Sequence, residues 1–191
     1  ALKMARSEPE KEQVLIVNDP AAGLTGYVVV DNLAIGPAIG GLRMASDVSV
    51  VEVARLARAM TWKNAAAGLP HGGAKAGIVA DPSLTYEAKV ELVRAFGVRI
   101  RDVVGYIPGP DMGLDERLMA HLRDACGRAV GLPAVVGGIP LDVLGATGFG
   151  LAIAAEVAAE RGLLPLTGAR VVVQGFGSVG QHAARFLRDR G

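Results

Sequence analysis

The chain has 191 residues, of which 51% are hydrophobic and 20% charged, and its net charge at pH 7 is +1. This composition allows a substantial buried core and excludes a disordered chain, and the mixing of acids and bases gives no indication of a nucleic-acid partner. The only cysteine, Cys126, excludes an intramolecular disulfide, and no apolar run is long enough to span a membrane. We therefore expect a cytoplasmic protein without a membrane partner.

The first elements predicted are strands. Residues 13–17 and 25–31 are rich in Val, Ile and Tyr and are separated by turn residues, which predicts a hairpin. A third extended piece, residues 36–44, contains Gly40 and Gly41. Glycines in a strand allow another group to approach the backbone closely, so we expect packing or binding there.

A helix is predicted to follow, over residues 50–66. Ser49 with Glu52 three residues later forms a capping box, and apolar residues then recur at helical spacing. This helix brings Lys63 to its last turn. A lysine there is explained equally well by a role at the helix C-terminus or by a role in binding.

The stretch from residue 61 to residue 82 is almost uncharged except for its two lysines, Lys63 and Lys75. Lys75 lies among glycines and alanines, which leave room for a substrate beside its amine. Apolar surroundings suit a lysine to proton transfer or nucleophilic work. The alternative is a solvated lysine in a glycine-rich turn. A strand is expected over residues 78–81, with Lys75 at its start.

A second acid–base candidate follows an amphipathic helix predicted over residues 86–103. Residues 103–107 are β-prone and deliver the chain to a proline- and glycine-rich loop that contains Asp111. A carboxylate fixed in such a loop is positioned for catalysis. The alternative is that Asp111 caps the next helix, predicted over residues 114–126.

The last third of the chain reads as the start of a nucleotide-binding fold. Residues 127–150 are rich in glycine and mark a hinge, after which a helix opens near Thr147, a residue that also suits an N-cap. A valine strand over residues 169–174 and a helix over residues 181–190 enclose a GxGxxG turn. Its candidate cofactor-binding residues are Gly175, Gly177, Ser178, Val179 and Gly180.

Residues 69–82, LPHGGAKAGIVADP, resemble the active-site signature of the glutamate/leucine/phenylalanine/valine dehydrogenases, and further matches run from about residue 36 to residue 180. The resemblance implies oxidative deamination of an L-amino acid to a 2-oxo acid and ammonia, with NAD or NADP. Lys75 and Asp111 would be catalytic, Lys63 would bind the α-carboxylate, and Thr147 would face the nicotinamide ring. His71 is unusual within the motif, and its role is open.

Substrate class is predicted from Ile39. Glutamate-specific relatives have a lysine just before the paired glycines, here Gly40 and Gly41, where it holds the side-chain carboxylate. An isoleucine cannot pair with that charge, and burying it alone would cost several kcal/mol. The prediction is an apolar substrate with Ile39, Gly40 and Gly41 at its binding site. Glutamate dehydrogenase and a non-catalytic regulatory or assembly subunit are the alternatives, while the scattered histidines indicate no metal site.

The predicted fold class is α/β, in two parts. Residues 1–140 would form a substrate-binding and oligomerisation domain with a mixed sheet and flanking helices, and the family resemblance implies a homo-oligomer assembled through it. Residues 141–191 would form a hinge helix and the truncated start of a Rossmann-type nucleotide-binding domain. We expect the chain to be a fragment of a longer enzyme and to be inactive alone, and the residue that would distinguish NAD from NADP is expected beyond residue 191.

Overall fold

The structure is a computed structural model that describes residues 13–162 and 165–191; the polar N-terminal stretch, residues 1–12, lies outside the described residues. The chain divides into two compact units, Ala1–Gly138 and Ile139–Gly191.

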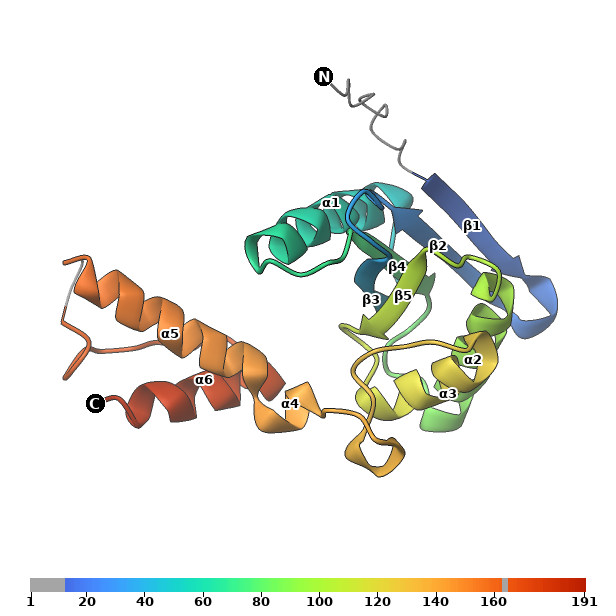
Figure 1. Ribbon diagram of the computed structural model, residues 1–191. Helices are drawn as coiled ribbons and strands as arrows, with labels where there is room; N and C mark the ends of the chain where they lie inside the picture. Colours follow the sequence, from blue (N-terminus) through green and yellow to red (C-terminus); the bar gives the residue numbers. More distant parts are fainter. Residues whose placement is uncertain (1–12, 163–164) are drawn as a thin grey trace, which may run out of the picture. The chain divides into compact units, whose positions relative to one another are not determined.

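Unit 1 is built around a five-stranded mixed sheet with the order β1-β2-β4-β3-β5 (Figure 1). The strands are β1 (Gln13–Asp19), β2 (Leu24–Val30), β3 (Ala38–Ala45), β4 (Ala74–Val79) and β5 (Tyr106–Pro110). β1 and β2 form the predicted antiparallel hairpin, β2 also pairs antiparallel with β4, and β3 lies parallel between β4 and β5. The predicted α/β fold with a mixed sheet is confirmed.

One face of the sheet packs against α2 (Tyr86–Ile100) and α3 (Glu116–Cys126). Val28, Leu42 and Ile78 of the strands are fully buried together with Phe96 and Leu122 of these helices. Such burial contributes roughly 1.5–3 kcal/mol for each large apolar side chain. This core fixes the strands whose opposite face carries the candidate site.

The opposite face packs against α1 (Val50–Ala66), mainly over β2 and β4, and Figure 1 shows α1 on the other side of the sheet from α2 and α3. Val53 and Ala57 of the helix pack with Val29 of β2. Ser49 caps α1 as predicted, because its hydroxyl accepts a hydrogen bond from the Glu52 N–H at 3.3 Å. The helix therefore begins and ends where the apolar spacing predicts.

Unit 2 contains three helices among its described residues: α4 (Leu141–Leu144), α5 (Ala146–Glu160) and α6 (Ser178–Arg188). The strand predicted over residues 169–174 was wrong, since that segment pairs with no strand among residues 13–162 and 165–191, and Val172 is 94% exposed. A strand forms only with a hydrogen-bonded neighbour, and the described part of unit 2 offers none. None of the helices in the described ranges has both the length and the apolar character to cross a bilayer.

Candidate active site

Lys75 and Asp111 meet in unit 1. Lys75 is the second residue of β4, and Asp111 follows β5 directly. The Lys75 Nζ lies 2.8 Å from the Asp111 Oδ2, and the two side chains are 8% and 24% exposed. An amine and a carboxylate at hydrogen-bond distance, both largely withdrawn from water, are suited to proton exchange with a bound molecule.

Strand register explains why these groups share a face. β3 and β4 are parallel, with Leu42 opposite Ala76, so Gly41 lies opposite Lys75; on its other side Gly41 pairs with Gly109 of β5, two residues before Asp111. Residues two apart in a strand project from the same face. Ile39, Gly41 and Arg43 of β3 therefore project on the Lys75 side of the sheet.

Gly41 makes room for the pair. A Cβ atom at this position would lie 2.8 Å from the Asp111 Cβ and 3.3 Å from the Lys75 Nζ. Gly40 has a different role, because a Cβ there would lie 1.6 Å from the Ala74 carbonyl oxygen of the neighbouring strand. Gly41 thus leaves space at the site, and Gly40 lets β3 approach β4.

A third charge binds Asp111. The Arg43 Nε donates a hydrogen bond to the Asp111 Oδ2 at 2.9 Å, and the Arg43 Nη1 pairs with the Glu52 carboxylate on α1. Sequence reasoning missed Arg43 and assigned Glu52 to a capping box. The signal was present in the strand alternation, since Arg43 lies two residues beyond Gly41.

The pKa of the Asp111 carboxyl reflects these neighbours. Burial raises it, but the hydrogen bonds and positive charges of Lys75 and Arg43 outweigh burial and hold the pKa below its ordinary value of 3.8. Asp111 is therefore ionised at neutral pH and can accept a proton.

The loop that carries Asp111 is anchored at two further points. The Met44 N–H donates to the Met112 carbonyl at 2.9 Å, and the Lys89 Nζ on α2 donates to the Gly113 carbonyl at 3.0 Å. The N-cap of α3 is Asp115, whose side chain accepts from the Leu118 N–H at 2.9 Å. The capping alternative for Asp111 is thus wrong, and its side chain binds Lys75 and Arg43 instead.

Lys63 lies in the last turn of α1 and is exposed. Within residues 13–162 and 165–191 the structure gives it no ion pair or side-chain hydrogen bond with Lys75 or Asp111. Its neighbour Asn64 is buried and donates from Nδ2 to the Gly72 carbonyl at 2.7 Å. The end of α1 is therefore fixed to the glycine-rich segment before Lys75, next to the exposed residue Lys63.

His71 has a structural contact. Its Nδ1 lies 3.0 Å from the Pro37 carbonyl oxygen, so this nitrogen donates the hydrogen bond. A backbone hydrogen bond joins the same two segments: the Ile39 N–H donates to the Gly72 carbonyl at 3.1 Å. His71 thus fastens the segment before β3 to the segment before β4, beside half-buried Ile39.

In unit 2 the structure brings Thr147, Ser178 and Val179 to the lining of one small hollow at the start of α5 and α6. Gly145 is the N-cap of α5, so the capping alternative for Thr147 is wrong. The N-cap of α6 is Gly177, which has no side chain to cap the helix, and the N-terminus of a helix is a type of site that binds anions.

The turn of the GxGxxG segment also fits a nucleotide. Gly175 has φ +81°, and a Cβ at Gly180 would lie 2.1 Å from the Gly175 carbonyl oxygen. Only glycines allow this turn to lie against the first turn of α6. Gly177 precedes the helix as its N-cap. These residues fit a dinucleotide pyrophosphate.

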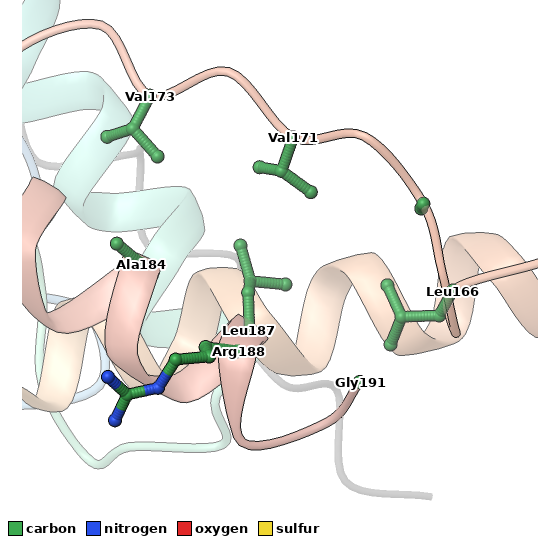
Figure 2. Close-up of a pocket in the computed structure, with 8 residues that line it drawn as sticks. Leu166, Val171, Val173, Ala184, Leu187, Arg188 and Gly191 are labelled. Carbon is green, nitrogen blue, oxygen red and sulfur yellow. The ribbon is translucent and has the colours of Figure 1, made fainter.

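A cavity of about 470 Å³ lies elsewhere in unit 2, as Figure 2 shows. It separates residues 166–173 from α6 and is lined mainly by apolar side chains, among them Leu166, Val171, Val173 and Leu187. The candidate glycines do not line it. We interpret this cavity as space left beside the unpaired valine segment, and not as a ligand-binding site.

The fold and the lysine–aspartate pair define a class of protein. The family described as Glu/Leu/Phe/Val dehydrogenase, dimerisation domain, matches residues 11–128, and the family described as Glutamate/Leucine/Phenylalanine/Valine dehydrogenase matches residues 137–191. The chain belongs to the glutamate/leucine/phenylalanine/valine dehydrogenase family, as the signature motif indicated.

Two relatives that are similar to this chain in sequence are named as glutamate dehydrogenases. The chain is 39% identical to a glutamate dehydrogenase of Aeropyrum pernix, with 87% of this chain and 43% of the relative covered. It is 43% identical to the NAD-specific glutamate dehydrogenase A of Halobacterium salinarum, with 85% and 40% covered. The chain therefore spans less than half the length of these relatives.

Solved structures of amino-acid dehydrogenases are also similar to this chain. A hetero-hexameric glutamate dehydrogenase from Thermus thermophilus, in its Leu-bound form, matches with a TM-score of 0.80 and 35% identity over 96% of this chain and 48% of that chain. An L-tryptophan dehydrogenase from Nostoc punctiforme matches with a TM-score of 0.60 and 28% identity over 93% of this chain and 51% of that chain.

Proposed function

We propose that the longest natural protein containing this chain is an NAD(P)-dependent amino-acid dehydrogenase. It would convert an L-amino acid and water to a 2-oxo acid and ammonium while the nicotinamide cofactor is reduced. The observation that carries the proposal is the 2.8 Å contact between the Lys75 Nζ and the Asp111 Oδ2, the two residues that the family resemblance implies are catalytic.

Three side chains of unit 1 have proposed roles. Lys75 would hydrogen-bond the reacting centre, assist attack of water on the imine and stabilise the carbinolamine that forms. Asp111 would move protons to and from the amino group, for which its ionised state is suited. Lys63, an exposed residue, would bind the α-carboxylate as a point charge.

The nucleotide would be held by Gly175, Gly177, Ser178, Val179 and Gly180, with Thr147 beside the nicotinamide ring. When bound, the cofactor supplies the oxidation of the substrate's Cα–H bond. The residues' own contribution is to hold the pyrophosphate at the uncapped start of α6. We propose residues 1–140 as the substrate-binding and oligomerisation domain and residues 141–191 as the start of the nucleotide-binding domain.

For the substrate, two observations point to different side chains. The names of the Aeropyrum and Halobacterium relatives favour glutamate. Ile39 favours an apolar side chain, because it projects on the Lys75 side of the sheet and offers no charge to a second carboxylate. We propose glutamate as the first substrate to test and leucine, valine and phenylalanine as the second group.

A regulatory or assembly subunit is the second candidate function. The Thermus structure is named as a hetero-hexamer, which contains unlike subunits, and Ile39 is a departure that a subunit without glutamate turnover would tolerate. The intact Lys75–Asp111 pair favours the catalytic function over this one. We further propose a cytoplasmic homo-oligomer assembled through the N-terminal domain, which the family description of that domain supports.

The experiment is a substrate panel. The longest natural protein is incubated with glutamate, leucine, valine, phenylalanine and tryptophan, each with NAD and with NADP, and reduced cofactor is followed by absorbance. The proposal predicts turnover of at least one amino acid. If none of these pairs gives turnover, the regulatory function replaces it.

A further inference from the structure

Two cations converge on one oxygen of Asp111. The Lys75 Nζ is 2.8 Å and the Arg43 Nε 2.9 Å from the same atom, Oδ2. For the other oxygen, Oδ1, the structure gives no hydrogen-bond partner among residues 13–162 and 165–191. The carboxylate is thus bound on one side and free on the other.

Arg43 is itself fixed at two points. Its Nε binds Asp111 after β5, and its Nη1 binds Glu52 in the first turn of α1. Its side chain is 19% exposed. The planar guanidinium therefore spans from α1 to the Asp111 loop, and two points of attachment define its orientation.

We propose that Arg43 is a positioning residue that holds the Asp111 Oδ2, so that Oδ1 is presented to the substrate as the proton acceptor. The inference rests on the proposed function of Lys75 and Asp111 and adds a residue that acts through Asp111 without touching the substrate. Lys75, which faces the reacting centre, is then free to leave Oδ2 during turnover while Arg43 keeps the carboxylate in place.

The charges around Asp111 decide the effect of pH. The groups on the elements packed around it are Arg43 on β3, Lys75 on β4, Glu52 on α1, Lys89 on α2, Tyr106 on β5, and Asp115 and Glu116 at the start of α3. Among residues 13–162 and 165–191, only Lys75 and Arg43 form ion pairs with its carboxylate. Removing the Arg43 charge should raise the pKa of Asp111, because Lys75 alone would then oppose the effect of burial.

The change in the pKa of Asp111 determines the direction in which the pH profile of kcat/KM moves. Asp111 must be unprotonated to accept a proton, so activity is lost as the pH falls through its pKa. A higher pKa in Arg43→Gln moves the acid limb of the kcat/KM profile to higher pH, and poorer positioning lowers kcat about 10-fold or more at the optimum.

The test uses two readouts. Carboxyl ¹³C NMR titration of the 191-residue chain measures the pKa of Asp111, and the pH profile of kcat/KM is measured with the longest natural protein. Arg43→Lys keeps the charge but cannot bridge Glu52 and Asp111, so it should restore the pKa while kcat stays low. Arg99→Gln is the matched control, because Arg99 pairs with Asp19 at 3.1 Å elsewhere on unit 1; it should leave both readouts unchanged.

The outcomes separate the two proposals. If the titration of Asp111 in Arg43→Gln stays at the wild-type pKa, the inference is overturned even where the wild type is active. If the titration moves and the wild type shows no turnover, the positioning contact stands and the proposed function fails. Should Arg43→Gln not fold, Arg43→Lys decides, and a wild-type kcat in that variant overturns the inference.

Discussion

At position 39 a single side chain separates the two candidate substrate classes. Ile39 pairs in register with Ile107 of β5 and bridges to Gly73 before β4, on the face that carries Lys75. Under the proposed function, a glutamate side chain beside Ile39 would lose hydration without gaining a cation from that residue. We therefore propose that the side chain at position 39 affects specificity.

Ile39→Lys should raise the kcat/KM for glutamate relative to leucine. A charged hydrogen bond contributes about 1.5–3 kcal/mol, which corresponds to roughly 10-fold to 100-fold in the ratio. Ile16→Lys is the control, because Ile16 is exposed on β1 at the far edge of the sheet. Steady-state kinetics with both substrates measures the ratio, and an unchanged ratio would show that position 39 does not contact the substrate.

The residues of the site were predictable to different degrees. Lys75 and Asp111 stand in motifs, and the structure brings them within 2.8 Å. Arg43 and Glu52 carry no motif, and each has an ordinary local explanation, on a strand and in a capping box. Their pairing depends on how α1 packs on the sheet, which spacing along the chain does not specify.

At the scale of elements, the guanidinium of Arg128 connects α2, α3 and β5. Arg128 donates hydrogen bonds to five backbone carbonyls: those of Ile100, Arg101, Val103, Tyr106 and Cys126. These carbonyls lie at the C-terminal ends of α2 and α3, in the segment that follows α2, and at the first residue of β5. Helix ends leave such groups without intrahelical partners, so one side chain satisfies several of them.

Arg128→Ala should lower the free energy of unfolding by about 2–4 kcal/mol, because partly buried carbonyls lose their donors. Arg128→Lys should recover only a small part, since an ammonium cannot reach the same set of acceptors. Arg101→Ala is the control: it also binds a helix-end carbonyl, that of Ala125, but it is exposed. Urea denaturation measures each variant, and an equal loss for Arg101→Ala and Arg128→Ala would contradict this role.

Elements with local signals were predicted well. The hairpin of β1 and β2 and the helix α1 follow from alternation, turn residues and a cap, all of which lie within a few residues. The predicted strand at residues 169–174 failed for a different reason. Its valines favour extended backbone, yet strand formation depends on a neighbour distant in sequence, and the described residues of unit 2 contain none.

At the scale of the whole molecule, the candidate site residues are divided between two compact units. Unit 1 holds the charged site, and unit 2 holds the glycine turn and the uncapped start of α6. The chain spans less than half the length of its glutamate dehydrogenase relatives, so turnover is a property to be measured on the longest natural protein.

The most direct measurement compares that protein with its Lys75→Ala variant, using the amino acid and cofactor that give the highest wild-type turnover. Thermal unfolding is followed in parallel, to show that the variant is folded. We predict a fall in kcat/KM of about 10²–10⁴-fold with the cooperative unfolding transition retained. A folded Lys75→Ala protein with wild-type kcat/KM would contradict the assignment of the Lys75–Asp111 pair as the catalytic centre.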